Sequence, residues 1–257
     1  MTEEPRVIAW FSCGAASAVA TKLALEKYGP ERVTVVYCDT MIDEHPDNQR
    51  FFDDIQQWLG IPIQRIQSDK YNSIEDVFEA RKYMSGIAGA PCTVELKKVP
   101  RFEFQRGDDI HVFGYTREEQ RRLERFEQSN PELSLDWILR DLDYSKGRCL
   151  ATLEDAGIAL PVLYGLDEAF KNNNCLGCVK ASSSKYWNAV RRHFPEVWER
   201  RAEMSRRLGV RMTRIKGERV FIDELPLDED DGVIEDISCG PECADEQTAF
   251  DFAALAN

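Results

Sequence analysis

The feature that most constrains the fold is the alternation of short apolar runs with helical patterns over the first 115 residues. The clearest run is Val33–Cys38, which is rich in β-branched residues and contains no charge. Strands of this kind occur in parallel sheets, whose two faces are both covered by helices. The stretch 47–59 has its apolar residues on one helical face, as packing on a sheet requires. The sequence therefore predicts an α/β fold with a doubly wound parallel sheet in three layers.

The pattern along the chain divides it into three parts. We expect strands at 6–12, 33–38, 61–66 and 110–114, helices at 18–28, 47–59 and 73–83, and a further helical segment from Pro91. Residues 130–184 show no strong strand pattern, whereas 185–192 and 195–208 have the pattern of helices and 219–223 that of a short strand. We expect a nucleotide-binding core at 1–130, a helical, cysteine-bearing extension at 131–222 and an acidic tail at 223–257.

Small residues connect the first expected strand to the first expected helix. The connection Ser12–Ser17 reads Ser-Cys-Gly-Ala-Ala-Ser. A helix that begins at such a turn presents unpaired N–H groups, which favour an anion, and serine hydroxyls add further donors. The Gly-Lys-Ser/Thr of a Walker loop is absent. The alternative is a plain strand–turn–helix corner, in which small residues only permit close packing.

Polar segments follow two further expected strands. Asp39 and Thr40 come after the second strand, and 117–122 lies just beyond the fourth. In a doubly wound sheet, ligands bind at the carboxyl ends of the strands, so we expect both segments to converge with Ser12–Ser17. Lys97, Arg117 and Arg121 would supply positive charge to a reacting anion. The alternative for these cations is a set of solvent-exposed ion pairs.

The net charge of −13 is unevenly distributed. Of the 46 acidic residues, twelve lie in 223–257, which has no Lys or Arg, and the rest of the chain is close to neutral. Residues 185–219 contain eleven basic and four acidic residues. Such a block indicates either a footprint for a polyanion, such as a nucleic-acid acceptor, or a solvated helix face.

Eight cysteines in one chain suggest metal or redox chemistry if the compartment is reducing. Cys13, Cys38 and Cys149 stand singly and have the context of packing residues. Cys92 follows a proline, and the others form two pairs, which are Cys175 with Cys178 and Cys239 with Cys243. A closed metal site needs four ligands. Cys92, Cys175 and Cys178 with Cys239, Cys243 or Cys149 would provide them, as would the two pairs together. The alternatives are a redox dithiol or ordinary turn cysteines.

Targeting signals are not evident in the sequence. No run of eighteen apolar residues is present, and the first residues lack the basic start and apolar core of a signal peptide. We therefore expect a cytoplasmic protein that does not interact with a membrane.

Several motifs together resemble the phosphoadenosine phosphosulfate (PAPS) reductase group of the PP-loop ATP pyrophosphatases. The resemblance covers about residues 6–210 and includes the cysteine-bearing, phage-associated branch of that group. The similar segments are Ser12–Ser17, Asp39–Met41, 44–60, Cys92–Pro100, Gly114–Arg122, Cys175–Lys180 and 186–196. Two positions depart from the family pattern, because Ala16 replaces the usual Asp of the loop and Cys13 replaces its first Gly.

The resemblance implies a fold like that of the adenine nucleotide alpha hydrolases and an enzyme that acts on the sulfate or phosphate group of ATP, PAPS or adenosine phosphosulfate (APS). The implied nucleotide-binding residues are Ser12, Cys13, Gly14, Ala15, Ala16, Ser17, Asp39, Thr40 and Gly114. The implied catalytic residues are Cys239, Cys243, Lys97, Arg117 and Arg121. A tail thiolate would attack the sulfur and yield sulfite after reduction by a thioredoxin-like partner. The resemblance leaves a homodimer open.

The resemblance also implies a cofactor. A [4Fe-4S] cluster would be held by Cys92, Cys175, Cys178 and Cys239, with zinc as the alternative metal.

Two other functions remain open from the sequence. One is an ATP-dependent adenylating sulfurtransferase that modifies a nucleic-acid base or backbone. The other is a nucleotide sensor without catalysis, in which Ala16 marks the lost catalytic position.

Overall fold

A five-stranded parallel sheet forms the centre of the protein. The structure, a computed structural model, describes residues 4–86, 89–237 and 239–241. The strands lie in the order β3-β2-β1-β4-β5. Their bounds are β1 (Val7–Trp10), β2 (Val33–Cys38), β3 (Ile63–Ile66), β4 (Ile110–Val112) and β5 (Ser134–Asp136). The order reverses between β1 and β4, which is where ligands bind in doubly wound sheets.

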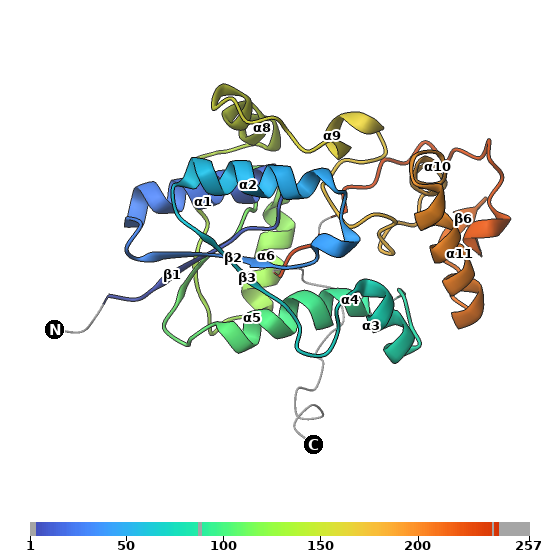
Figure 1. The fold of residues 1–257 in the computed structure, drawn as a ribbon, viewed down its shortest axis with the longest axis horizontal. Coiled ribbons are helices and arrows are strands. Elements are labelled where there is room, and N and C mark those ends of the chain that lie inside the picture. The colour runs from blue at the N-terminus through green and yellow to red at the C-terminus, as the bar shows by residue number, and fades with distance from the viewer. Residues whose placement is uncertain (1–3, 87–88, 238, 242–257) are drawn as a thin grey trace, which may run out of the picture.

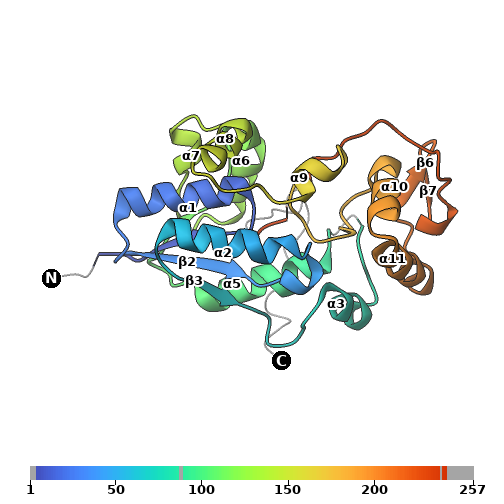
Figure 2. The same cartoon turned by 45° about the horizontal axis from the view of Figure 1, so that its top comes forward.

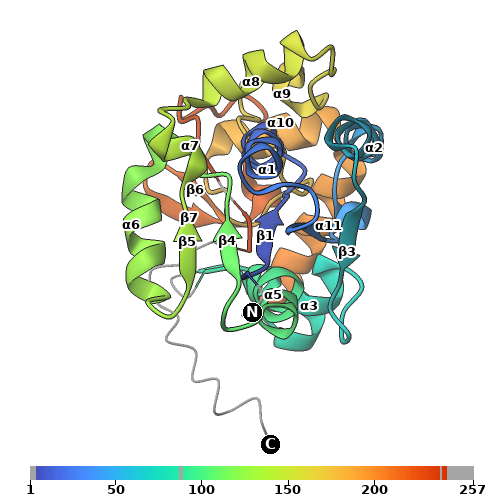
Figure 3. The same ribbon diagram turned by 90° about the vertical axis from the view of Figure 1, so that its left-hand side faces the viewer.

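Helices cover both faces of this sheet (Figures 1 and 3). One face packs against α1 (Ala15–Tyr28), α2 (Asp47–Leu59), α7 (Ile138–Asp141) and α8 (Lys146–Asp155). The other packs against α5 (Val99–Phe104) and α6 (Gln120–Ser129). Alternate residues of β1 point to opposite faces, so that Val7 and Ala9 join one apolar core while Ile8 and Trp10 join the other. The predicted parallel α/β sheet is confirmed.

The strongest sequence patterns gave the most accurate bounds. The expected strand 33–38 and helix 47–59 match β2 and α2 residue for residue. The helical segment from Pro91 comprises α4 (Pro91–Thr93), the π-helical turn η2 (Val94–Lys98) and α5. Between β3 and this segment lies α3 (Ile74–Arg81). Its N-terminus is capped by a capping box, in which Ser73 is the N-cap and Asp76 is the third helical residue.

The core continues past residue 130, where the sequence suggested that it ends. β5 pairs with β4 in parallel, with Val112 opposite Asp136. Helix α8 then returns along α1, where Cys149 and Leu153 are buried in the same core as the strands. Only after α8 does the chain leave the sheet.

The extension lies beyond the carboxyl edge of the sheet (Figure 2). It contains α9 (Leu163–Leu166), α10 (Ser184–His193), α11 (Pro195–Leu208) and the antiparallel pair β6 (Thr213–Ile215) and β7 (Glu218–Val220). Its apolar core is shared with α3, through Ile74, Val77 and Phe78. In the described part of the chain, no helix is long and apolar enough to cross a membrane.

The first part of the acidic tail packs on the extension. The Glu235 carboxylate accepts hydrogen bonds from the N–H groups of Ser182 and Ser183, at 2.9 and 3.1 Å. Asp231 accepts from Ser184 N–H at 3.0 Å. Two carboxylates thus cap the N-terminus of α10, where negative charge is favourable. After this contact, Asp236, Cys239 and Gly240 lie at the carboxyl edge of the sheet.

His111 is enclosed in the centre of the sheet, as its place in an expected strand suggested. Its ring is fully buried, and Trp10 Nε1–H donates to His111 Nδ1 at 3.0 Å. Burial, reinforced by the charge of Arg101, lowers the pKa of His111 to about 4. The folded protein therefore holds this ring neutral.

Acid should destabilise the protein through His111. The unfolded chain takes up a proton near the ordinary histidine pKa, whereas the folded chain does so only near 4, so stability is lost as the pH falls through this window. Between about pH 7 and about pH 5, we expect the free energy of unfolding to fall by about 2 kcal/mol more in the wild type than in His111→Gln. The glutamine can still accept from Trp10. Urea unfolding at the two pH values measures this difference. An equal loss of unfolding free energy in the wild type and in His111→Gln would contradict a neutral buried ring.

Candidate functional site

The first turn of α1 leaves N–H groups unpaired. The chain turns at Ser12–Gly14 and the helix begins at Ala15. Ala15 N–H donates to Tyr164 Oη at 3.3 Å. Within the described residues, the N–H groups of Ala16 and Ser17 have no hydrogen-bond partner. Because helix N-termini carry partial positive charge, this turn is suited to bind an anion.

The side chain of Ser17 holds the loop in shape. Its Oγ accepts from Ser12 N–H at 3.0 Å and donates to the Gly14 carbonyl at 2.9 Å. The Ser12 hydroxyl donates to Ser17 Oγ at 3.1 Å. Ser17 is buried, so its hydroxyl serves the loop, and Ser12 is the more accessible of the two serines.

Cys13 takes the backbone conformation that glycine prefers. Its φ is 56°, a left-handed value that costs a non-glycine residue about 1 kcal/mol. Its side chain is buried, with Sγ–H directed at the Asn48 carbonyl at 3.5 Å. Its own carbonyl accepts from Asn173 Nδ2 at 2.7 Å. Burial raises the pKa of the Cys13 thiol, which is therefore a packing group.

Gly114 permits close approach of β4 to the start of α1. A Cβ at this position would lie 2.6 Å from Ser17 N and 2.7 Å from Ser17 Cα. Both are backbone atoms, so any side chain at 114 would displace the loop. The resemblance-based assignment of Gly114 to the site therefore has a steric reason.

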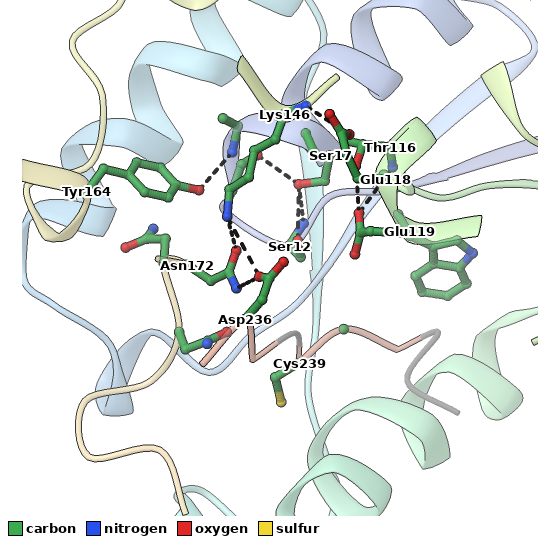
Figure 4. A pocket seen from close by; sticks show the side chains of 18 residues that line it. Ser12, Ser17, Thr116, Glu118, Glu119, Lys146, Tyr164, Asn172, Asp236 and Cys239 are labelled. Carbon is green, nitrogen blue, oxygen red and sulfur yellow. Dashed lines mark hydrogen bonds and ion pairs between the residues drawn. The ribbon is translucent and has the colours of Figure 1, made fainter. Parts of the chain in front are cut away.

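A cavity of about 200 Å³ opens at the first turn of α1 (Figure 4). Six segments supply its walls: the end of β1 and the loop, the segment after β4, the start of α8, helix α9, the loop around Asn173, and the tail. The lining residues are Trp10, Ser12, Gly14, Ala15, Ala16, Ser17, Gly114, Thr116, Glu118, Glu119, Lys146, Tyr164, Asn172, Asn173, Asn174, Asp236, Cys239 and Gly240. The loop, Gly114 and Cys239 were all expected in the site from the sequence.

Lys146 is the cation of this cavity, and the sequence analysis missed it. Its Nζ donates to the Lys171 carbonyl and to Asn172 Oδ1, both at 2.6 Å, and lies 3.8 Å from Asp236 Oδ1. Burial lowers the pKa of Lys146. The residue begins α8 directly after Ser145, whose Oγ accepts from Arg148 N–H as an N-cap. The capping serine was the available signal, but nothing in the sequence places α8 beside the loop.

Asp39 and Thr40 do not line the cavity. Asp39 accepts from Met41 N–H and pairs with Arg65 at 3.0 Å. Thr40 is buried, and its hydroxyl donates to Glu44 Oε1 at 2.6 Å. Both residues stabilise the end of β2, beside the site.

Arg117 and Arg121 also lie outside the cavity. Arg117 is half-exposed and pairs with Asp143 at 2.9 Å. Arg121 is exposed on α6. Thr116 N–H donates to the Glu119 carboxylate in a capping box, and this turn sends Glu118 and Glu119, instead of the arginines, to the cavity wall.

Lys97 is buried below the cavity and fixes the tail. Its Nζ donates to the Cys239 carbonyl at 2.8 Å. Burial alone would lower the pKa of Lys97, but negative charge on Cys239, Cys175 and Glu44 outweighs it and raises the pKa. Glu44 is itself buried and accepts from Tyr37, Thr40 and Asn48. Lys97 is therefore an ammonium that attracts the tail and the thiols around it.

The thiols of Cys92, Cys175 and Cys178 belong to the apolar core of the extension, near the end of the described tail at Cys239. The side chain of Cys239 points away from Ser12 and Ser17 (Figure 4), and its Sγ lies 3.5 Å from Thr93 Oγ1. Burial raises the pKa of Cys92, Cys175 and Cys178, the last to about 11, and negative charge on Cys239 contributes to the rise in each. The thiols of the three segments therefore affect one another's ionisation.

The Cys175–Cys178 turn is held by three elements. Leu176 N–H donates to the Asp43 carbonyl at 2.8 Å, and Cys178 N–H donates to Tyr186 Oη at 2.7 Å. Gly177 has a φ of 62°, and a Cβ there would lie 2.9 Å from Val197 Cγ1 on α11. In the described residues, no three His, Cys, Asp or Glu side chains are arranged to hold a metal ion. Cys243 lies outside the described residues.

Comparisons with known proteins do not assign the chain to a family. No model of a known protein family matches it, and no curated protein matches its sequence.

Substitution of Gly114 tests the geometry of the loop. Gly114→Ala should destabilise the protein by about 1–3 kcal/mol, because the added Cβ overlaps the backbone of Ser17. It should also weaken binding of an adenine nucleotide by about tenfold or more, measured by calorimetry. The matched control is Gly107→Ala, where a Cβ meets nothing within 4 Å. Equal behaviour of the two variants would contradict the close approach.

Proposed function

We propose that this protein is a PAPS/APS reductase-like enzyme. It binds an adenine nucleotide with the loop Ser12–Ser17 and acts on the nucleotide's sulfate or phosphate group. The supporting observation is that unpaired helix N–H groups, a lysine and a cysteine-bearing segment line one cavity. Charged phosphate or sulfate oxygens would accept from Ala16 and Ser17 N–H, with Lys146 as counter-ion.

The reaction needs a thiolate that faces the cavity. The thiolate sulfur attacks the sulfate sulfur, an S–S bond forms, and the S–O bond to the nucleotide breaks with its electron pair on the departing phosphate. A second thiol from a thioredoxin-like reductant then attacks the protein sulfur, which releases sulfite and leaves a disulfide. Cys239 is the first candidate, because the residue lines the cavity and its carbonyl accepts from the Lys97 ammonium at 2.8 Å. Cys243 is the other candidate.

A thiolate-bound metal group would require Cys92, Cys175, Cys178 and Cys239 to come closer together than they do in the structure, where no three of them are arranged to hold an ion. Cys92, Cys175, Cys178 and Cys239 match the four-cysteine donor set of a [4Fe-4S] cluster or a structural zinc site. When bound, such a group would supply redox chemistry in the first case and only structural support in the second. Cys239 cannot serve as ligand and nucleophile at once. Measuring the metal content and the activity of a Cys239 variant distinguishes the two roles.

A second candidate is favoured by the acids of the cavity. Glu118, Glu119 and Asp236 stand against one lysine in its wall. Carboxylates beside a polyphosphate suit Mg²⁺, the usual companion of ATP. Because Mg²⁺ would bridge these carboxylates and the phosphates of ATP, this composition favours the ATP-dependent adenylating sulfurtransferase.

The reductase proposal predicts sulfite release from PAPS or APS with a thiol reductant. Cys239→Ser or Cys243→Ser should reduce the rate by about a hundredfold or more, since the loss removes the nucleophile. Cys149→Ser is the matched control, because that thiol is buried between α8 and the sheet. Pyrophosphate release from ATP without any sulfite from PAPS or APS would contradict the reductase and support the sulfurtransferase.

The metal proposal predicts iron and acid-labile sulfide, or zinc, in protein purified without oxygen. Cys175→Ser with Cys178→Ser should remove the metal and lower stability, because metal binding adds to folding free energy. Cys149→Ser should keep the metal, although a hydroxyl buried in the apolar core lowers stability by itself. Metal-free wild-type protein that is as stable as the metal-loaded protein would contradict a metal site. Sulfite release by that metal-free protein would then be assigned to its free thiols.

A further inference from the structure

The basic block of the extension separates into two classes of arginine. Most arginines on the helices are neutralised by ion pairs. Arg200 and Arg201 pair with Glu75, Arg206 pairs with Asp223 and Glu224, and Arg207 pairs with Glu79. The helices themselves are therefore not a free cationic surface.

The hairpin that follows the helices retains its positive charge. Its basic residues are Arg211, Arg214, Lys216 and Arg219, and all four are exposed. No ion pair to any of them is found in the described part of the chain. Glu218 is the acidic residue of the hairpin, and it pairs in register with Ile215.

Two of these cations lie directly opposite each other. Arg214 and Arg219 are cross-strand partners, whereas the neighbouring partners Thr213 and Val220 lie on the more buried side. Like charges in directly opposed positions destabilise a sheet. Arg219 Nη1 donates to the Arg211 carbonyl at 3.1 Å, and this bond keeps the Arg219 guanidinium close to residue 211. An anion bound to the hairpin would remove this repulsion between like charges.

The shape of the hairpin indicates what kind of anion. Lys216 and Gly217 both have positive φ, at 50° and 89°, and form a tight turn that presents Lys216 beyond the paired arginines. The guanidinium of Arg211 lies over the Phe221 ring at 5.2 Å, which fixes its position. The charges thus extend along a narrow two-stranded ribbon, an element that fits the major groove of duplex DNA. Arginine forks match phosphate oxygens in pairs.

We propose that the hairpin β6–β7, with Arg211, Arg214, Lys216 and Arg219, binds the phosphodiester backbone of nucleic acid. The contact is electrostatic and independent of base sequence. It is also independent of the nucleotide cavity, so it stands or falls separately from the proposed activity.

The test is fluorescence anisotropy with a labelled duplex DNA of mixed sequence, using the full chain. Arg214→Gln with Arg219→Gln should weaken binding about tenfold or more and reduce the slope of log affinity against log salt by about 2. The matched control is Arg206→Gln with Arg207→Gln, which removes the same charge from ion-paired arginines and should change affinity less than about threefold.

Stability provides a second measurement. The hairpin variant should be no less stable than the wild type, because it removes a like-charge pair. Absence of wild-type binding at low salt, or equal losses in the two variants, would overturn the proposal. Competition by polyglutamate as effective as that by unlabelled DNA at equal charge would also overturn it, and would assign the hairpin to acidic proteins.

Discussion

The close approach of Gly114 to Ser17 brings the chain after β4 against the start of α1, at the point where the strand order reverses. Because no Cβ intervenes, the end of β4 lies directly against the first turn of α1. The unpaired N–H groups of that turn then face the segment that follows β4 and the start of α8. Ser17, Cys13 and Gly114 together set a loop whose conformation exposes backbone donors. The surrounding side chains are arranged in relation to those donors.

The tail completes this arrangement from outside the sheet. Carboxylates at 231 and 235 cap α10, and the chain then turns to the cavity, where Lys97 binds the Cys239 carbonyl. Lys97, a buried ammonium, therefore lies between the cavity and the thiols of the extension, bound to the tail at Cys239. The charge of Lys97 is sustained by Glu44, so the polar network beneath β2 contributes to the site without lining it. The described part of the acidic tail thus belongs to the walls of the cavity.

The sequence predicts the parts of the fold whose patterns are strong and local. β2 has an uninterrupted apolar run, and α2 has a clear apolar face, so their bounds are correct. β5 is missed because Ser134–Asp136 is three residues long and lacks β-branched side chains. The motif Ser12–Ser17 indicates the loop, but the place of Arg117 depends on a capping box that turns the chain outward. Lys146 reaches the cavity through the packing of α8 on α1, a contact that no local pattern encodes.

The central claim is that the first turn of α1 binds the anionic group of an adenine nucleotide. Amide chemical shifts of isotope-labelled protein, followed during titration with ADP, test this most directly. The account predicts that the largest changes occur at Ala16, Ser17 and Gly114. Changes confined to other surfaces, or none at saturating nucleotide, would contradict it.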